Sequence, residues 1–124
     1  MKKVLIVDDE LDTRTLIRKL LEDEGLQVYT AKDGKEGIRN IKKTKFDLVL
    51  IDMFMPGMSG REMCERIKND DKIKHTRFAF LTVAQFGEQG KEELKRLGSL
   101  DYIQKPIDNE NFIKRIRKIV KRKA

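Results

Sequence analysis

Five polar residues stand at the ends of short apolar runs in this chain, and together they have the chemistry to accept a phosphoryl group. They are Asp8, Asp9, Asp52, Thr82 and Lys105. Three carboxylates held close together repel one another, and a hard cation with oxygen ligands, such as Mg²⁺, relieves that repulsion. The charges of three aspartates, one divalent cation and one lysine cancel. A neutral, oxygen-rich pocket with a fixed cation and a hydroxyl donor is suited to phosphoryl transfer.

Asp52 is the predicted nucleophile, since an aspartate can take a phosphoryl group to form an acyl phosphate. It ends an apolar run, and the loop 53–60 that follows is rich in turn residues. Asp8 and Asp9 are adjacent, so their side chains diverge and are better placed to clamp a metal. The alternative for strand-end acids is helix capping, which we expect of Asp12. Five complementary residues at four strand ends argue against capping for the whole set.

The elements that must position these residues are short strands alternating with helices. Apolar runs predict strands buried on both faces at 4–7, 28–31, 48–51 and 78–81, with a weaker one at 102–103. Between and after them, apolar residues recur at helical spacing. Strand then helix, five times over, predicts an α/β fold: a doubly wound, five-stranded parallel sheet with five helices. Ligands of such sheets bind at the carboxyl ends of the strands, where the five polar residues fall.

Composition excludes several other classes of protein. The 124 residues are 39% apolar and 40% charged, and no run approaches the ~20 apolar residues that a membrane span needs. The lone Cys64 cannot form an internal disulfide, which favours a reducing compartment. The apolar stretch after Met1 is too short for a signal peptide. We therefore expect one domain over 1–124, located in the cytoplasm and without membrane insertion.

The net charge of +7 comes from the last helical stretch. Residues 112–124 contain no acid and seven basic residues: Lys114, Arg115, Arg117, Lys118, Lys121, Arg122 and Lys123. Such a helix could meet nucleic acid, anionic lipid or an acidic partner, but a solvated face is the simpler interpretation. We do not expect this domain alone to bind nucleic acid, because clustered aromatic residues and a recognition-helix pattern are absent from the sequence.

At this point the sequence resembles a known family. The motifs are Asp8-Asp9, Asp52-x-x-Met55-Pro56-x-x-Ser59-Gly60, Thr82, and Tyr102-x-x-Lys105-Pro106. In this order they resemble the receiver domain of two-component response regulators, and the single-domain chemotaxis type is nearest in organisation. The resemblance covers Lys3 to about Val120. It implies the flavodoxin-like strand order 2-1-3-4-5.

The resemblance also implies roles for the site residues. Asp52 would accept phosphoryl from a phosphohistidine on a sensor histidine kinase or a phosphotransfer protein. Mg²⁺, with Mn²⁺ as an alternative, would be held by the side chains of Asp9 and Asp52 and the backbone carbonyl of Phe54. Asp8 would act nearby, often through water. Lys105 would pair with the phosphoryl oxygens.

A conformational switch is the second implication of the resemblance. Thr82 would shift to hydrogen-bond the phosphoryl group, and Tyr102 would turn inward into the vacated space. The fourth helix, last strand and last helix would form a surface for an unknown downstream protein. The chain would be a monomer or a phosphorylation-dependent dimer, and the Lys105–Pro106 peptide would be cis.

One residue departs from the family pattern. Receivers usually carry Ala or Gly after the strand-four hydroxyl, and this chain has Val83. A stiff β-branched side chain there, with Phe54 opposite, would narrow access to the acyl phosphate. We therefore predict slow phosphorylation by small donors and a long-lived phospho-form. The alternative is that Val83 packs in the core.

The main competing function is a Mg²⁺-dependent aspartyl-phosphate phosphohydrolase or mutase. That class resembles this one in its nucleophilic aspartate, but it places an acid/base aspartate two positions later. Phe54 stands there in this chain and cannot move a proton. The sequence thus predicts no enzyme activity beyond phosphotransfer to, and hydrolysis from, its own Asp52.

Overall fold

The computed structural model describes residues 1–121. Arg122 and Lys123, two of the seven basic residues expected on the last helix, lie outside the described residues. Five strands form one parallel sheet: β1 (Lys3–Val7), β2 (Gln27–Ala31), β3 (Leu48–Asp52), β4 (Phe78–Thr82) and β5 (Tyr102–Gln104). Their order is β2-β1-β3-β4-β5, which confirms the order that the family resemblance implied.

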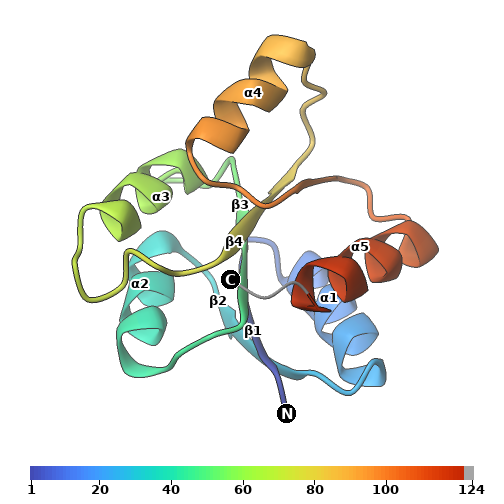
Figure 1. Ribbon diagram of the computed structural model, residues 1–124. Helices are drawn as coiled ribbons and strands as arrows, with labels where there is room; N and C mark the ends of the chain where they lie inside the picture. Colours follow the sequence, from blue (N-terminus) through green and yellow to red (C-terminus); the bar gives the residue numbers. More distant parts are fainter. Residues whose placement is uncertain (122–124) are drawn as a thin grey trace.

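Five helices follow the strands in turn. They are α1 (Leu11–Asp23), α2 (Gly34–Lys43), α3 (Gly60–Lys68), α4 (Glu88–Arg96) and α5 (Asn109–Lys121). Helices α1 and α5 cover one face of the sheet, α2 and α3 cover the other, and α4 lies beyond β4 (Figure 1). The predicted doubly wound α/β fold is therefore confirmed. None of the helices within residues 1–121 is both long and apolar enough to cross a membrane.

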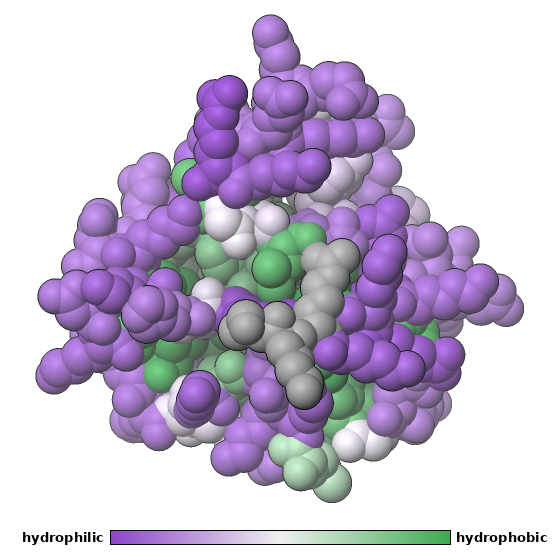
Figure 2. Space-filling view, viewed as in Figure 1, coloured by the Kyte–Doolittle hydropathy of each residue, from purple (hydrophilic) through white to green (hydrophobic). Residues whose placement is uncertain are grey.

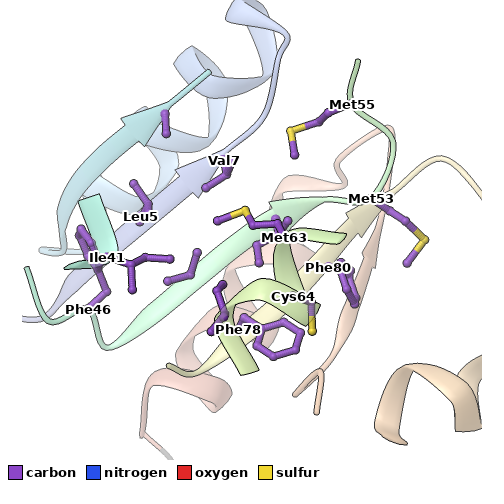
Figure 3. Close-up of a cluster of buried hydrophobic side chains, with 14 of the residues drawn as sticks. Leu5, Val7, Ile41, Phe46, Met53, Met55, Met63, Cys64, Phe78 and Phe80 are labelled. Carbon is purple, nitrogen blue, oxygen red and sulfur yellow. The ribbon is translucent and has the colours of Figure 1, made fainter. Parts of the chain in front are cut away.

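The sheet separates two apolar clusters. One, shown in Figure 3, packs α2 and α3 against side chains such as Leu5, Val7 and Phe80. The other packs α1 and α5 against Ile6 and Leu50. Strands β1, β3 and β4 contribute to both clusters, which explains why their sequences are continuously apolar.

The prediction of burial on both faces is wrong for the two edge strands. In the predicted run 28–31 of β2, Tyr29 and Thr30 are only half-buried. In the predicted run 102–103 of β5, Ile103 is buried but Tyr102 is only half-buried. An edge strand has a neighbour on one side only and fewer helices over it, so part of its surface stays in solvent.

The expectation that Asp12 caps α1 is also wrong. The helix begins at Leu11, the capping position is Glu10, and no side chain bonds the free backbone amides there. Asp12 lies in the first turn, where its negative charge interacts favourably with the positive end of the helix dipole. Helix α3 follows the ordinary rule, since Ser59 Oγ accepts from the Glu62 N–H.

Candidate functional site

Four carboxylates meet at the carboxyl ends of β1 and β3. Oxygens of Asp8, Asp9, Glu10 and Asp52 lie within 4.8 Å of one another. Asp8 is 0% exposed and Asp52 is 4% exposed, whereas Asp9 and Glu10 are open to solvent. A cluster with two buried and two exposed carboxylates is open on one side, as a site for an incoming ligand must be.

Strand pairing brings the two buried aspartates together. Strands β1 and β3 pair in parallel with Val7 opposite Ile51, so the next residues, Asp8 and Asp52, lie side by side at the carboxyl ends of the two strands, and Asp52 is also paired with Leu81 of β4. The N–H of Asp8 also donates to the carbonyl of Ala31 in β2 at 3.1 Å. Neither aspartate backbone is therefore free to move away from the other.

The start of α3 presses directly on the end of β3. A Cβ added at Gly60 would lie 2.4 Å from the carbonyl oxygen of Asp52, closer than real Cβ atoms approach. The N–H of Gly60 donates to the carbonyl of Met53 at 3.0 Å. The absence of a side chain at Gly60 is thus required for α3 to pack closely against the end of β3.

Lys105 lies at the centre of the acidic cluster. Its Nζ is 2.7 Å from Asp8 Oδ2, 3.1 Å from Glu10 Oε1 and 3.5 Å from Asp52 Oδ2. The Lys105 N–H donates to the carbonyl of Thr82 at 2.7 Å, which aligns the residue with the end of β4. The Lys105 ammonium therefore contacts three carboxylates, and the Lys105 side chain is only 9% exposed.

Burial changes the acid–base behaviour of both central groups. It raises the pKa of Asp52 from 3.8 to about 6; the charge of Asp8 adds to the rise and Lys105 opposes it. Burial alone would lower the pKa of Lys105, but its hydrogen bond to Asp8 and the charges of Asp52 and Asp8 outweigh that effect and raise the pKa. Lys105 therefore stays charged at neutral pH. Its positive charge does not fully offset the effects of burial and of Asp8 on the Asp52 carboxylate.

The residues present fit a hard divalent cation. Asp8 Oδ2 is buried, and within residues 1–121 it contacts the ammonium of Lys105 at 2.7 Å. Its other oxygen accepts from the Glu10 N–H at 2.9 Å. A buried carboxylate oxygen with spare acceptor capacity, among other carboxylates, matches the all-oxygen coordination that Mg²⁺ prefers.

The remaining predicted residues surround this cluster. Thr82 is fully buried, and its Oγ1 accepts from the Ala84 N–H at 3.0 Å. The N–H of Phe54 donates to Asp52 Oδ1 at 3.2 Å, and Phe54 as a whole is 56% exposed. Val83 is 66% exposed, which excludes the alternative that it packs in the core.

Tyr102 is half-buried on β5, an edge strand of the sheet. Its ring meets Phe86 edge to face, with 5.9 Å between the ring centroids. The Nζ of Lys91, on α4, lies 5.9 Å from the Tyr102 ring centroid. The ring thus connects β5 with α4 and the loop before it. The Lys105–Pro106 peptide is cis, as the resemblance implied.

The sequence matches the family described as response regulator receiver domain over residues 4–117. The chain belongs to this family.

Similar proteins agree with this assignment. The receiver is 34% identical to the sporulation initiation phosphotransferase F of Bacillus subtilis, over 99% of this chain and 97% of that protein. Its fold matches the chemotaxis response regulator CheY4 of Vibrio cholerae with a TM-score of 0.86 and 32% identity, covering 96% and 98% of the two chains. Several other curated relatives are longer, and this chain spans about half of their length.

A third similar structure bears on the metal. The response regulator TrrA of Thermotoga maritima, in complex with Mg²⁺-BeF, matches this receiver with a TM-score of 0.80 and 29% identity, over 96% of this chain and 99% of that one. Receiver domains bind Mg²⁺ at an acidic pocket, and this receiver has a matching cluster of carboxylates at the ends of β1 and β3.

Sequence reasoning missed Glu10. It contacts Lys105 as closely as the predicted aspartates do, yet it lies one residue beyond the Asp8-Asp9 motif. The available signal was the run of three consecutive acids after a strand. Glu10 was overlooked because the loop after β1 must turn back before its longer side chain reaches the lysine.

Proposed function

We propose that this receiver is a signalling module switched by phosphorylation of Asp52. The observation that carries the proposal is the position of this carboxylate: almost fully buried at the end of β3, 3.5 Å from Lys105 Nζ and beside two further aspartates. Family membership supports a phosphohistidine as the donor, on a sensor histidine kinase or a phosphotransfer protein.

In the proposed reaction, an Asp52 carboxylate oxygen attacks phosphorus in line with the bond to the donor histidine. The new O–P bond forms as the P–N bond breaks, and the electron pair of that bond returns to the imidazole. Lys105 balances the charge of the phosphoryl oxygens and leaves part of its contact with Asp8 and Glu10 to do so. The product is an acyl phosphate on Asp52.

The metal belongs to the same proposal. Asp9 and Asp52 would hold Mg²⁺ through their side chains and Phe54 through its backbone carbonyl, with Asp8 nearby; Mn²⁺ is an alternative ion. The ion supplies positive charge that neutralises the carboxylates and the incoming phosphoryl oxygens. Hydrolysis back to free Asp52 is the only other reaction proposed, and Val83 and Phe54 would slow the entry of the water that it needs.

The response to phosphorylation is proposed to pass through Thr82 and Tyr102. A phosphoryl group on Asp52 would give the buried Thr82 hydroxyl, whose oxygen now accepts from the Ala84 N–H, a strong acceptor for its own proton. Movement of Thr82 would release space for Tyr102, whose contacts with Phe86 and Lys91 would then change. The surface formed by α4, β5 and α5 would present this change to a downstream protein. The receiver would act as a monomer or as a phosphorylation-dependent dimer.

A cytoplasmic location completes the proposal. The thiol of Cys64 is buried and free, which fits a reducing compartment. The basic side of α5 is proposed to be a solvated face, with no nucleic-acid binding by this domain alone.

Labelled phosphate tests the central step. Wild type incubated with Mg²⁺ and a phosphohistidine-bearing kinase should gain label, and Asp52→Asn should gain none, because the amide is not a nucleophile. Asp71→Asn is the matched control, since Asp71 is exposed and distant from the cluster. Labelling of the Asp52 variant at the wild-type rate would disprove the assignment.

A further inference from the structure

The end of the sheet opposite to Asp52 has a groove of about 660 Å³. One wall is the end of α2 with the segment 42–46, and the other is the loop 70–76 before β4. Its volume lies within the roughly 300–1,000 Å³ of typical small-molecule sites. In Figure 2, hydrophobic atoms show between hydrophilic side chains in this region beside α2 and α3.

Apolar side chains form the floor of the groove. Ile41, Phe46 and Ile73 line it and are each only 7% exposed. Phe46 is held from behind by Tyr29, whose ring meets it edge to face with 5.2 Å between centroids. The floor is therefore anchored in the core.

Hydrogen bonds hold the loop wall in place. The N–H of Ile73 donates to the carbonyl of Asp70 at 3.0 Å, and the N–H of Thr76 donates to the carbonyl of Ile73 at 3.0 Å. The N–H of Lys72 donates to Asp70 Oδ1 at 2.9 Å. Successive turns of this kind preform the groove, which lowers the entropy lost when a ligand binds.

The rim is strongly basic. Its charged residues are Lys42, Lys43, Lys45, Lys72 and one acid, Asp70, with His75 beside them. Lys42 Nζ lies 3.6 Å from Asp70 Oδ2. Within residues 1–121, the other three lysines of the rim form no ion pair with a carboxylate. Four lysines and one aspartate leave the groove with a formal charge of +3 when the histidine is neutral.

We propose that this groove binds a nucleoside diphosphate or a similar organic diphosphate. Such a ligand carries about −3 at neutral pH, because its terminal phosphate has a second pKa near 6, and this charge matches the rim. Lysine ammonium groups bind phosphate oxygens as point charges. The base or sugar would lie on the apolar floor.

The composition of the rim favours a small ligand over a protein. Protein interfaces are rich in arginine and exposed aromatic side chains and poor in lysine. The rim has lysines and no arginine, and the one phenylalanine that lines the groove, Phe46 in the floor, is almost fully buried. An acidic protein segment would find charge here but no exposed aromatic residue to pack on.

Isothermal titration of the full chain with ADP, in EDTA and at low salt, tests the proposal. EDTA keeps Mg²⁺ out of the carboxylate cluster, which then repels anions. Wild type should bind one ADP per chain. The triple variant Lys43→Ala, Lys45→Ala, Lys72→Ala should bind at least about tenfold more weakly, which corresponds to about 1.4 kcal/mol. Absence of saturable binding to wild type would overturn the site.

A charge-matched triple variant separates the groove from a general effect of net charge. Lys19, Lys95 and Lys114 are exposed and lie outside the groove, so their replacement by alanine should leave the ADP affinity within about twofold of wild type. An equal loss in both triple variants would overturn the proposal. Thermal unfolding checks that each variant is folded.

Three further titrations decide the kind of ligand. Pyrophosphate carries the charge without the organic part, and adenosine carries the organic part without the charge. Both should bind more weakly than ADP, since each lacks one of the two complementary features. A glutamate-rich hexapeptide should also bind more weakly. If pyrophosphate or the peptide binds as tightly as ADP, the assignment of an organic diphosphate is wrong.

Discussion

Replacing Asp52 by asparagine is expected to raise the free energy of unfolding at neutral pH in the absence of metal. Burial, together with the charge of Asp8, raises the pKa of Asp52 from 3.8 to about 6 even though Lys105 opposes the rise. Each pKa unit is worth about 1.4 kcal/mol, so the folded protein holds this ionised carboxylate at a cost of about 3 kcal/mol. Asparagine has the same shape without the charge and should recover most of that cost.

The pH dependence follows from the direction of the shift. Because the pKa of Asp52 is higher in the folded than in the unfolded protein, the folded state binds more protons between about pH 4 and pH 6. The contribution of Asp52 therefore lowers the free energy of unfolding of wild type as the pH rises from about 4 to about 6. This decrease is absent below about pH 4 and complete above about pH 6. The advantage of the Asp52→Asn variant should shrink towards zero as the pH falls from about 7 to about 4.

Urea unfolding followed by circular dichroism, in EDTA and across this pH range, measures the difference. Asp71→Asn is the control: Asp71 is 94% exposed and its contact with Lys74 is on the surface, so stability should change by less than about 0.5 kcal/mol. Mg²⁺ should stabilise wild type more than the Asp52 variant. A variant that is less stable than wild type at neutral pH, or a difference that does not vary with pH, would refute the reasoning.

Three other perturbations test separate parts of the site. Val83→Ala should shorten the half-life of labelled phospho-Asp52 a few-fold, because ~1 kcal/mol of steric hindrance is removed. An unchanged or longer half-life would contradict the idea that Val83 restricts the access of water to the acyl phosphate. Asp9→Ala should weaken Mg²⁺ binding in calorimetric titration, and an undiminished Mg²⁺ affinity would show that Asp9 is not a ligand. Chelation of Mg²⁺ should stop phosphorylation of wild type. Gly60→Ala should lower the free energy of unfolding by about 2 kcal/mol or more, because the new Cβ would meet the Asp52 carbonyl oxygen at 2.4 Å. Gly87→Ala, where nothing lies within 4 Å, should change it by less than about 1 kcal/mol, and equal effects of the two substitutions would contradict the steric argument.

The meeting of Asp8, Asp52, Thr82 and Lys105 could be predicted because parallel strands are tightly constrained. Each residue stands at or just beyond the end of a strand, and the parallel pairing of β1 with β3, β3 with β4 and β4 with β5 carries these ends to one edge. A central strand with both faces covered is also easy to find in a sequence, since its apolar run has no polar interruption.

The parts that were not predicted depend on side chains reaching across loops. Glu10 and Asp12 are both acids near the start of α1, and the sequence does not show which one caps the helix. In the structure Glu10 is at the capping position, but its carboxylate contacts Lys105, which lies 95 residues away in the chain. A pattern read along the chain contains no information about such a partner.

The separation of charge along the strands has a consequence for communication within the molecule. Carboxylates gather at one end of the sheet and lysines at the other, and a five-residue strand spans about 16 Å. That length is about twice the Debye length of ~8 Å at physiological salt, so the two poles are largely screened from each other. Charge added at Asp52 would be weakly felt at the lysines through solvent. Any stronger influence of one end on the other would have to pass through the protein interior, by displacements of the closely packed sheet and helices or by the field within it, which salt screens far less.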